Sequence, residues 1–121
     1  MPGRISFDAE GRALVAGDVA LGVGWGSAAV LAITAGSNSQ RGAISVTASA
    51  STPAQATATI AITFPKAFDN VPFAVVSRAG GTAAVTVFPT VVTCTATVLT
   101  IISNTLPVSA EITIFSYFVA P

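Results

Sequence analysis

The stretch TATIAITF, residues 57–64, is the clearest β-strand pattern in this chain. Its odd-numbered positions hold small or hydroxyl-bearing residues, whereas its even-numbered positions hold Ala58, Ile60, Ile62 and Phe64. Side chains of a β-strand point alternately to the two faces of a sheet. The stretch therefore predicts a strand with one buried apolar face, as in an antiparallel sheet that is packed on one side.

The same two-residue period appears on both sides of this stretch. In AISVTA, residues 43–48, Ile44 and Val46 share one face. The closing segment AEITIFSYFV, residues 110–119, is apolar on both faces, which predicts a strand in the centre of a sheet or one buried against a neighbouring subunit. One face holds Ile112, Ile114, Ser116 and Phe118, and the other holds Thr113, Phe115, Tyr117 and Val119.

Short β-rich segments separated by turns fill the rest of the chain. Strands are expected at residues 29–33, 73–77, 84–88, 91–93 and 96–101. Gly80-Gly81 predicts a hairpin turn between the second and third of these, because glycine accepts positive φ. Seven or eight short strands at regular spacing indicate an all-β chain folded as an antiparallel β-sandwich, jelly-roll-like in type.

The distribution of charge divides the chain into two regions. Charged residues make up 8% of the sequence, against about 25% in an ordinary domain, and the formal net charge is zero. Half of them lie in the first 18 residues, namely Arg4, Asp8, Glu10, Arg12 and Asp18. We therefore expect a short N-terminal arm, or a first hairpin, over residues 1–18 and a β-sandwich domain over residues 19–121.

So few charges predict a surface that neighbouring subunits cover, because a neutral monomer tends to be poorly soluble. A monomer coated with Ser and Thr is the alternative. Trp25, which glycines flank, is expected either in the core or against another chain. The candidate interface residues are Trp25, Phe115, Tyr117 and Phe118. The candidate docking residues of the charged N-terminal segment are Arg4, Phe7, Asp8 and Arg12.

The residue inventory excludes several kinds of chemistry. The chain has no His, so neither a Ser-His-Asp triad nor a His metal site can form. Its single Cys, Cys94, permits no intrachain disulfide and no thiolate zinc site, and is expected to be a small buried apolar residue. Asp8 and Glu10 offer at most a weak cation site, and a solvated turn is the simpler interpretation. We predict no enzymatic activity and no cofactor.

Composition also bears on partners. No cluster of Lys and Arg is present, so the sequence predicts no nucleic-acid partner. The first residues lack a signal-peptide pattern, and glycines interrupt the uncharged stretch 19–40, so we expect no membrane insertion. Glycan binding is an alternative function, since amides, hydroxyls and aromatic rings suffice for it. Its candidate residues are Asn38, Gln40, Asn70, Asn104, Trp25 and Tyr117.

Three motifs resemble those of bacteriophage virion proteins. They are GWGS at residues 24–27, SQRG at 39–42 and ITFPKAFDNVPFAVVS at 62–77. In the third, a Thr/Ala-rich strand ends in Phe-Pro, a second Phe follows, and Pro72 opens a strand of Val-Val-Ser type. Over roughly residues 22–119 the chain is similar to β-domains at the ends of tail fibres and minor tail proteins, and to head-fibre or capsid-decoration modules.

The resemblance implies a structural virion subunit that is assembled in the host bacterial cytoplasm as a homotrimer. Its implied partners are copies of itself and other virion proteins, such as major capsid or tail proteins, reached through the N-terminal segment. A length of 121 residues favours a capsid-decoration, head-fibre or tail-tip component over a full tail fibre. The alternative is a receptor- or glycan-binding adhesin of a phage tail that recognises a host cell-surface glycan, although no dense aromatic or charged cluster marks a sugar site.

Overall fold

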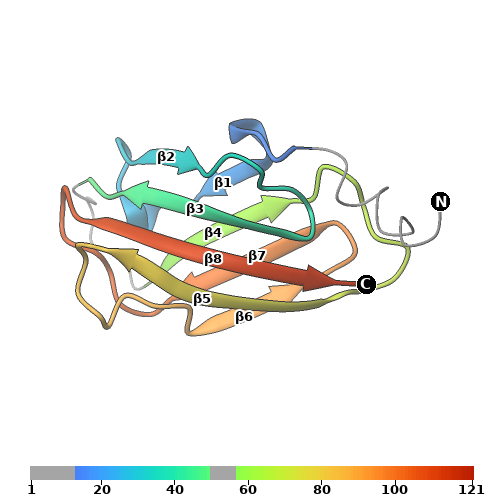
Figure 1. Cartoon of the computed structure of the whole chain (residues 1–121). Helices are drawn as coiled ribbons and strands as arrows, with labels where there is room; N and C mark the ends of the chain where they lie inside the picture. Colours follow the sequence, from blue (N-terminus) through green and yellow to red (C-terminus); the bar gives the residue numbers. More distant parts are fainter. Residues whose placement is uncertain (1–12, 50–56) are drawn as a thin grey trace.

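The computed structural model describes residues 13–49 and 57–121, and its eight strands form two four-stranded antiparallel sheets. The sheets face each other as two layers, with short 3₁₀ helices beside β1 (Figure 1). The all-β sandwich predicted from the sequence is confirmed. The elements are η1 (Ala16–Asp18), β1 (Val19–Leu21), η2 (Val23–Trp25), β2 (Val30–Ile33), β3 (Arg41–Thr47), β4 (Ala58–Thr63), β5 (Phe73–Gly81), β6 (Val91–Cys94), β7 (Val98–Ser103) and β8 (Ile112–Ala120).

Strand order distinguishes the two sheets. The first sheet has the order β1-β4-β7-β6, and the second has the order β2-β3-β8-β5. All neighbouring strands run antiparallel. Strand β8 is therefore an inner strand between β3 and β5, which confirms the central position that its apolar residues on both faces predict.

The core lies between the sheets and follows the two-residue period of the sequence. In β4, Ala58, Ile60 and Ile62 are fully buried, so the alternation in residues 57–64 does place one face inward. Burying each Ile or Leu side chain contributes about 1.5–3 kcal/mol to folding. The other large, fully buried aliphatic and aromatic side chains are Trp25, Ile44, Val46, Val87, Leu99, Ile101, Phe115 and Val119.

The hairpin predicted at Gly80-Gly81 is wrong. Strand β5 continues through both glycines and pairs with β8 to its end, with a β-bulge between Arg78 and Gly80. Gly81, at φ 108°, fits here because a Cβ would strike the backbone of Ile112. The positive φ of these glycines thus serves a bulged strand end rather than a two-residue turn.

Residues 84–88, predicted as a strand, instead form a loop that the Arg78 side chain holds from inside. The guanidinium donates hydrogen bonds to the carbonyl oxygens of Ala83, Ala84 and Val87 at 2.8–3.0 Å, and its Nε donates to Gly80 at 2.7 Å. In a strand, these carbonyl oxygens would accept hydrogen bonds from a neighbouring strand. Here they accept them from one side chain.

The Gly24-Trp25-Gly26 motif is a packing device. The Trp25 ring is fully buried, donates its indole N–H to the carbonyl oxygen of Thr59 at 3.1 Å, and meets the Phe115 ring edge-on. A Cβ on Gly24 would lie 2.1 Å from the carbonyl oxygen of Thr57. Only glycine therefore allows this segment to approach β4 closely enough to bury the indole.

The described part of the predicted N-terminal segment packs on the sandwich. Leu14 is buried in the core cluster, and its N–H donates to the carbonyl oxygen of Ser37 at 2.9 Å. Ala13 forms an isolated antiparallel bridge with Asn38. Asp18 accepts a hydrogen bond from the N–H of Val15 at 3.0 Å. Residues 13–18 are thus attached to the body of the domain.

Candidate functional site

The strongest candidate for a functional surface is the outer face of the second sheet. Four large apolar side chains are exposed there: Val30 at 62% on β2 and, on the neighbouring strands β5 and β8, Phe73 at 80%, Val75 at 66% and Phe118 at 57%. A side chain of this kind normally gains free energy by leaving water, so an exposed group of them indicates a contact surface. We call Phe73, Val75 and Phe118 the apolar patch.

Strand register brings the members of the apolar patch together. Val75 of β5 lies directly opposite Phe118 of β8, and Phe73 lies opposite Ala120, two residues further along β8. Residues directly opposite on an antiparallel pair have Cβ atoms about 4.5–5.5 Å apart, and diagonal neighbours lie within reach of aromatic rings. The three side chains therefore form one continuous surface on two adjacent strands.

The rest of the outer face is almost without charge. Arg41, opposite Phe118 on β3, is its single charged residue in the strands of the second sheet. Next to the patch, the hydroxyls of Ser77 and Ser116 lie 3.0 Å apart and are hydrogen-bonded. A face of this kind favours partners that are themselves apolar or neutral.

The structure corrects three of the four predicted interface residues. Trp25, Phe115 and Tyr117 are 0%, 0% and 4% exposed, and all three belong to the core cluster. Their side chains point between the sheets, because Phe115 and Tyr117 share the inward face of β8 with Thr113. Only Phe118, on the opposite face of that strand, presents its ring to the surface.

The predicted docking residues Arg4, Phe7, Asp8 and Arg12 lie outside the described residues. The weak cation site considered for Asp8 and Glu10 lies there as well. Across residues 13–49 and 57–121, no group of three His, Cys, Asp or Glu side chains is placed to hold a metal ion. Cys94, at the end of β6, is half-buried against the core, and this burial raises the pKa of its thiol.

Most of the candidate glycan-binding residues are also buried. Trp25, Tyr117, Asn38 and Gln40 are enclosed, and only Asn70 and Asn104 are exposed. The geometry thus offers no exposed aromatic platform from Trp25 or Tyr117.

Two of these buried residues build the turn before β3. The Asn38 side-chain oxygen accepts from the N–H groups of Gln40 and Arg41 at 2.8 and 3.1 Å. The Tyr117 hydroxyl donates to the carbonyl oxygen of Asn38 at 2.6 Å. Burial, with a smaller contribution from the negative charge of Asp18, raises the pKa of Tyr117 above its ordinary value. Tyr117 therefore acts as a structural hydrogen-bond donor.

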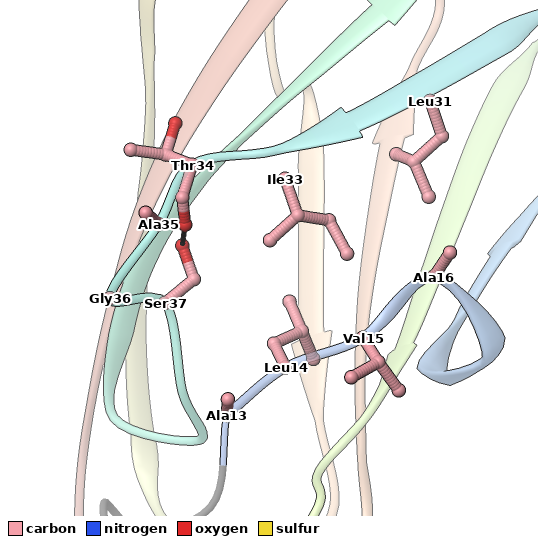
Figure 2. A pocket seen from close by; sticks show the side chains of 10 residues that line it. All are labelled: Ala13, Leu14, Val15, Ala16, Leu31, Ile33, Thr34, Ala35, Gly36 and Ser37. Carbon is pink, nitrogen blue, oxygen red and sulfur yellow. Dashed lines mark hydrogen bonds between the residues drawn. The ribbon is translucent and has the colours of Figure 1, made fainter.

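A shallow apolar pocket lies beside the second sheet, between residues 13–16 and the turn after β2 (Figure 2). Its volume is about 360 Å³, and Leu14, Leu31 and Ile33 point into it. The polar side chains in its lining are those of Thr34 and Ser37, and the Ser37 hydroxyl already donates to the Thr34 carbonyl oxygen at 2.7 Å. The pocket has room for a small apolar group and holds no charged or acid–base side chain.

Comparisons with protein-family models, with curated proteins and with solved structures found no match to this chain. Both helices among the described residues are three-residue 3₁₀ turns, and neither has the length or apolar character needed to cross a membrane. Sequence reasoning missed Phe73 and Val75 as surface residues. Their alternation with Ala74 and Val76 was visible, but which face lies outward depends on pairing with β8.

Proposed function

We propose that this chain is a structural subunit of a bacteriophage particle, a β-sandwich module that assembles with copies of itself and docks on other virion proteins. The observation that carries the proposal is the apolar patch of Phe73, Val75 and Phe118 on a sheet face where Arg41 is the single strand-borne charge. Exposed patches that are rimmed by polar residues are typical of protein–protein contact sites.

Two further features support an assembly role. The whole sequence is 8% charged with a formal net charge of zero, so copies of the chain do not repel one another over long distances. The motifs that resemble those of phage proteins also have structural roles in this fold. Gly42 of SQRG lies so close to Ser37 and the Tyr117 hydroxyl that a Cβ would approach within 2.7 Å of both.

Docking on the particle is proposed for the N-terminal segment. Because Leu14 is already buried in the core, a chain that starts at Ala13 keeps the sandwich while it loses Arg4, Phe7, Asp8 and Arg12. We expect this shortened chain to associate with itself as before and to fail to join particles.

The test is to locate the chain on virions of the phage that encodes it. Antibodies raised against the purified domain and coupled to gold should label one defined position, on the head or at the tail tip, in electron micrographs. Virions carrying the chain without residues 1–12 should be unlabelled. Purified virions without label, and without peptides of the chain by mass spectrometry, would contradict the proposal.

A further inference from the structure

The four edge strands of the sandwich differ greatly in length. The first sheet ends in β1 and β6, which have three and four residues, and β2 at one edge of the second sheet has four. Strand β5, at the other edge of the second sheet, has nine residues. Native proteins keep exposed edges short because unpaired N–H and C=O groups accept additional strands. The long β5 edge departs from that rule.

Protection of the β5 edge begins only halfway along it. The bulge between Arg78 and Gly80 and the loop that Arg78 holds occupy its second half. Its first half, Phe-Ala-Val-Val-Ser at residues 73–77, contains no charge, no proline and no bulge. In the described part of the chain the backbone of these five residues hydrogen-bonds only with β8. Strand β6 of the first sheet packs beside β5 but does not pair with it, so the N–H and C=O groups at this edge have no partner strand.

We propose that β5 pairs antiparallel with β5 of a second copy across a twofold axis, so that two second sheets join into one of eight strands. The inference rests on the proposed function, because it names the first contact by which the subunit assembles. It replaces the threefold arrangement that the resemblance implies with a twofold pair.

The occupant is a second copy because the open edge is complementary to itself. With Val75 of each chain at the axis, all five residues of the open segment are paired. Val75 then lies opposite Val75 of the partner subunit, and Phe73 lies opposite Ser77 of the partner subunit and diagonal to the partner's Val75. Aromatic and β-branched side chains are favourable cross-strand neighbours. The two apolar patches then meet across the junction on one face of the joined sheet.

Charge favours the antiparallel direction. Asp69 is exposed four residues before β5, and Arg78 lies near the opposite end of the open segment. When two β5 strands run antiparallel, the Asp69 end of each approaches the Arg78 end of the other. A parallel pair would bring like charges together at both ends, which is unfavourable.

Length favours a twofold pair over a ring. A threefold ring needs β5 to pair with a different edge of the next copy. Each other described edge supplies at most four residues. Self-pairing of β5 is isologous and closes with two copies, which is the commonest symmetry of homo-oligomers.

The experiment measures mass and amide exchange on the full chain. Sedimentation equilibrium at micromolar concentration should give twice the chain mass of 12.0 kDa. Hydrogen–deuterium exchange should show amides within residues 73–77 becoming protected as concentration rises through the dissociation constant. Val75→Lys should raise that constant by about 30-fold or more, since it removes the Val75 pair and places two lysines opposite each other at the axis.

Thr93→Lys is the matched control, because it adds the same charge to an exposed position of the short edge strand β6. It should change the dissociation constant by less than about twofold. Val75 is 66% exposed, so Val75→Lys should keep the melting temperature that the parent has at concentrations where both proteins are monomeric. The exchange measurement on the unaltered chain stands independently of either variant.

Three results would overturn the twofold pair. They are a mass of three chains, a monomer at every concentration, and an oligomer whose residues 73–77 exchange as fast as in Val75→Lys. If the oligomer leaves residues 73–77 unprotected and Phe118→Lys dissociates it, the subunits associate through the sheet face and not through the β5 edge. The virion role is tested separately. If gold labels the particle, that role is supported even when one of these three results excludes the twofold pair. If virions are unlabelled but the β5 edge is protected, only the virion role is contradicted.

Discussion

The two sheets have similar apolar cores but differ in where their exceptions to the inside–outside pattern lie. In the first sheet, the inner wall carries Ile60, Ile62, Leu99 and Ile101, all 0–1% exposed. Its outer face is rich in hydroxyls, with Thr59 and Thr63 on β4, Thr100 on β7 and Thr93 on β6, and Val91, 42% exposed, is its one large exposed apolar side chain among the described strands. In the second sheet, hydroxyls of Thr113 and Tyr117 lie inside, whereas Phe73, Val75 and Phe118 lie outside.

This difference distinguishes the residues that the fold itself requires from those that it does not require. The first sheet follows the pattern that a solvated sandwich needs: aliphatic residues inside, and β-branched hydroxyl residues that suit both a strand and water outside. The second sheet departs from it on both faces. The inner departure is explained for Tyr117, whose hydroxyl bonds to the turn before β3. The exposed side chains of the outer face are the basis of the contact with another chain that is proposed above.

The largest expected effect follows from making the outer face of the second sheet resemble that of the first. Phe73→Ser combined with Phe118→Ser should weaken self-association on the order of 100-fold, because exposed aromatic rings dominate contact surfaces. The free energy of unfolding of the monomer should change by less than about 1 kcal/mol, since both rings are exposed. Sedimentation equilibrium and urea unfolding measure the two quantities.

The control for this change is Thr59→Ser combined with Thr100→Ser, on the outer face of the first sheet. It should leave self-association within about twofold of the parent. Equal weakening by the two double variants would show that the apolar patch is not a special surface.

A smaller effect is expected inside the second sheet, at Tyr117. Tyr117→Phe removes the donor to the buried Asn38 carbonyl and should lower the free energy of unfolding by about 1–2 kcal/mol at neutral pH. Urea unfolding monitored by circular dichroism measures this loss. An unchanged midpoint would contradict the structural role assigned to the hydroxyl.

The raised pKa of Tyr117 adds a dependence on pH. An unfolded tyrosine ionises near pH 10, whereas the folded chain keeps this hydroxyl protonated to higher pH, so the contribution of Tyr117 to the free energy of unfolding is constant below about pH 10 and falls above it. Tyr117→Phe should show a shallower fall in that range. Since Tyr117 is the only tyrosine, tyrosinate absorbance follows it alone, and its midpoint should coincide with alkaline unfolding.

Removing the buried hydroxyl of Thr113 should stabilise the fold, whereas removing that of Tyr117 should destabilise it. Its hydroxyl oxygen is buried and has no hydrogen-bond partner among the described residues. Thr113→Val replaces it with a methyl group of similar size and should raise the free energy of unfolding by about 1 kcal/mol. Thermal melting provides the measurement, and a loss of stability would indicate a bond to this hydroxyl that the structure does not contain.

The smallest effect is expected from salt. Because Arg41 is the single charge in the strands of the second sheet's outer face, self-association should change less than about threefold between about 0.05 M and about 0.5 M NaCl. The approach of Asp69 to Arg78 of the partner subunit in the proposed pair adds a small salt dependence, because salt screens exposed charges. A much steeper salt dependence would mean that charges outside this face control association.

Much of this fold was predictable because alternation is a local signal. The alternation of Ala58, Ile60 and Ile62 predicts an inward face without knowledge of the neighbouring strands. The apolar residues on both faces of residues 112–119 predict an inner strand. The Gly80-Gly81 hairpin failed because a glycine pair serves a bulge as well as a turn. Residues 84–88 form a loop and not a strand because the Arg78 side chain bonds to their backbone, and no local sequence pattern predicts that contact.

The candidate surface was less predictable for a related reason. Phe118 was identified from its own strand, but Phe73 and Val75 join it only through the register of β5 with β8. Trp25 was expected in either the core or an interface, and the choice depends on Thr59 and Phe115, which are distant in sequence. Contacts between distant segments are not encoded in any one window of the chain.

The enclosed Trp25 also determines what light can report about this protein. It is the only tryptophan, and its ring packs 6.1 Å from the Phe115 centroid, on the side of β8 that faces away from the apolar patch. Its fluorescence should therefore be blue-shifted in the native state and move to the red only when the core opens. If another chain docks on the outer face as proposed, that emission should stay unchanged, so Trp25 provides an optical probe of the protein interior that is separate from the proposed contact surface.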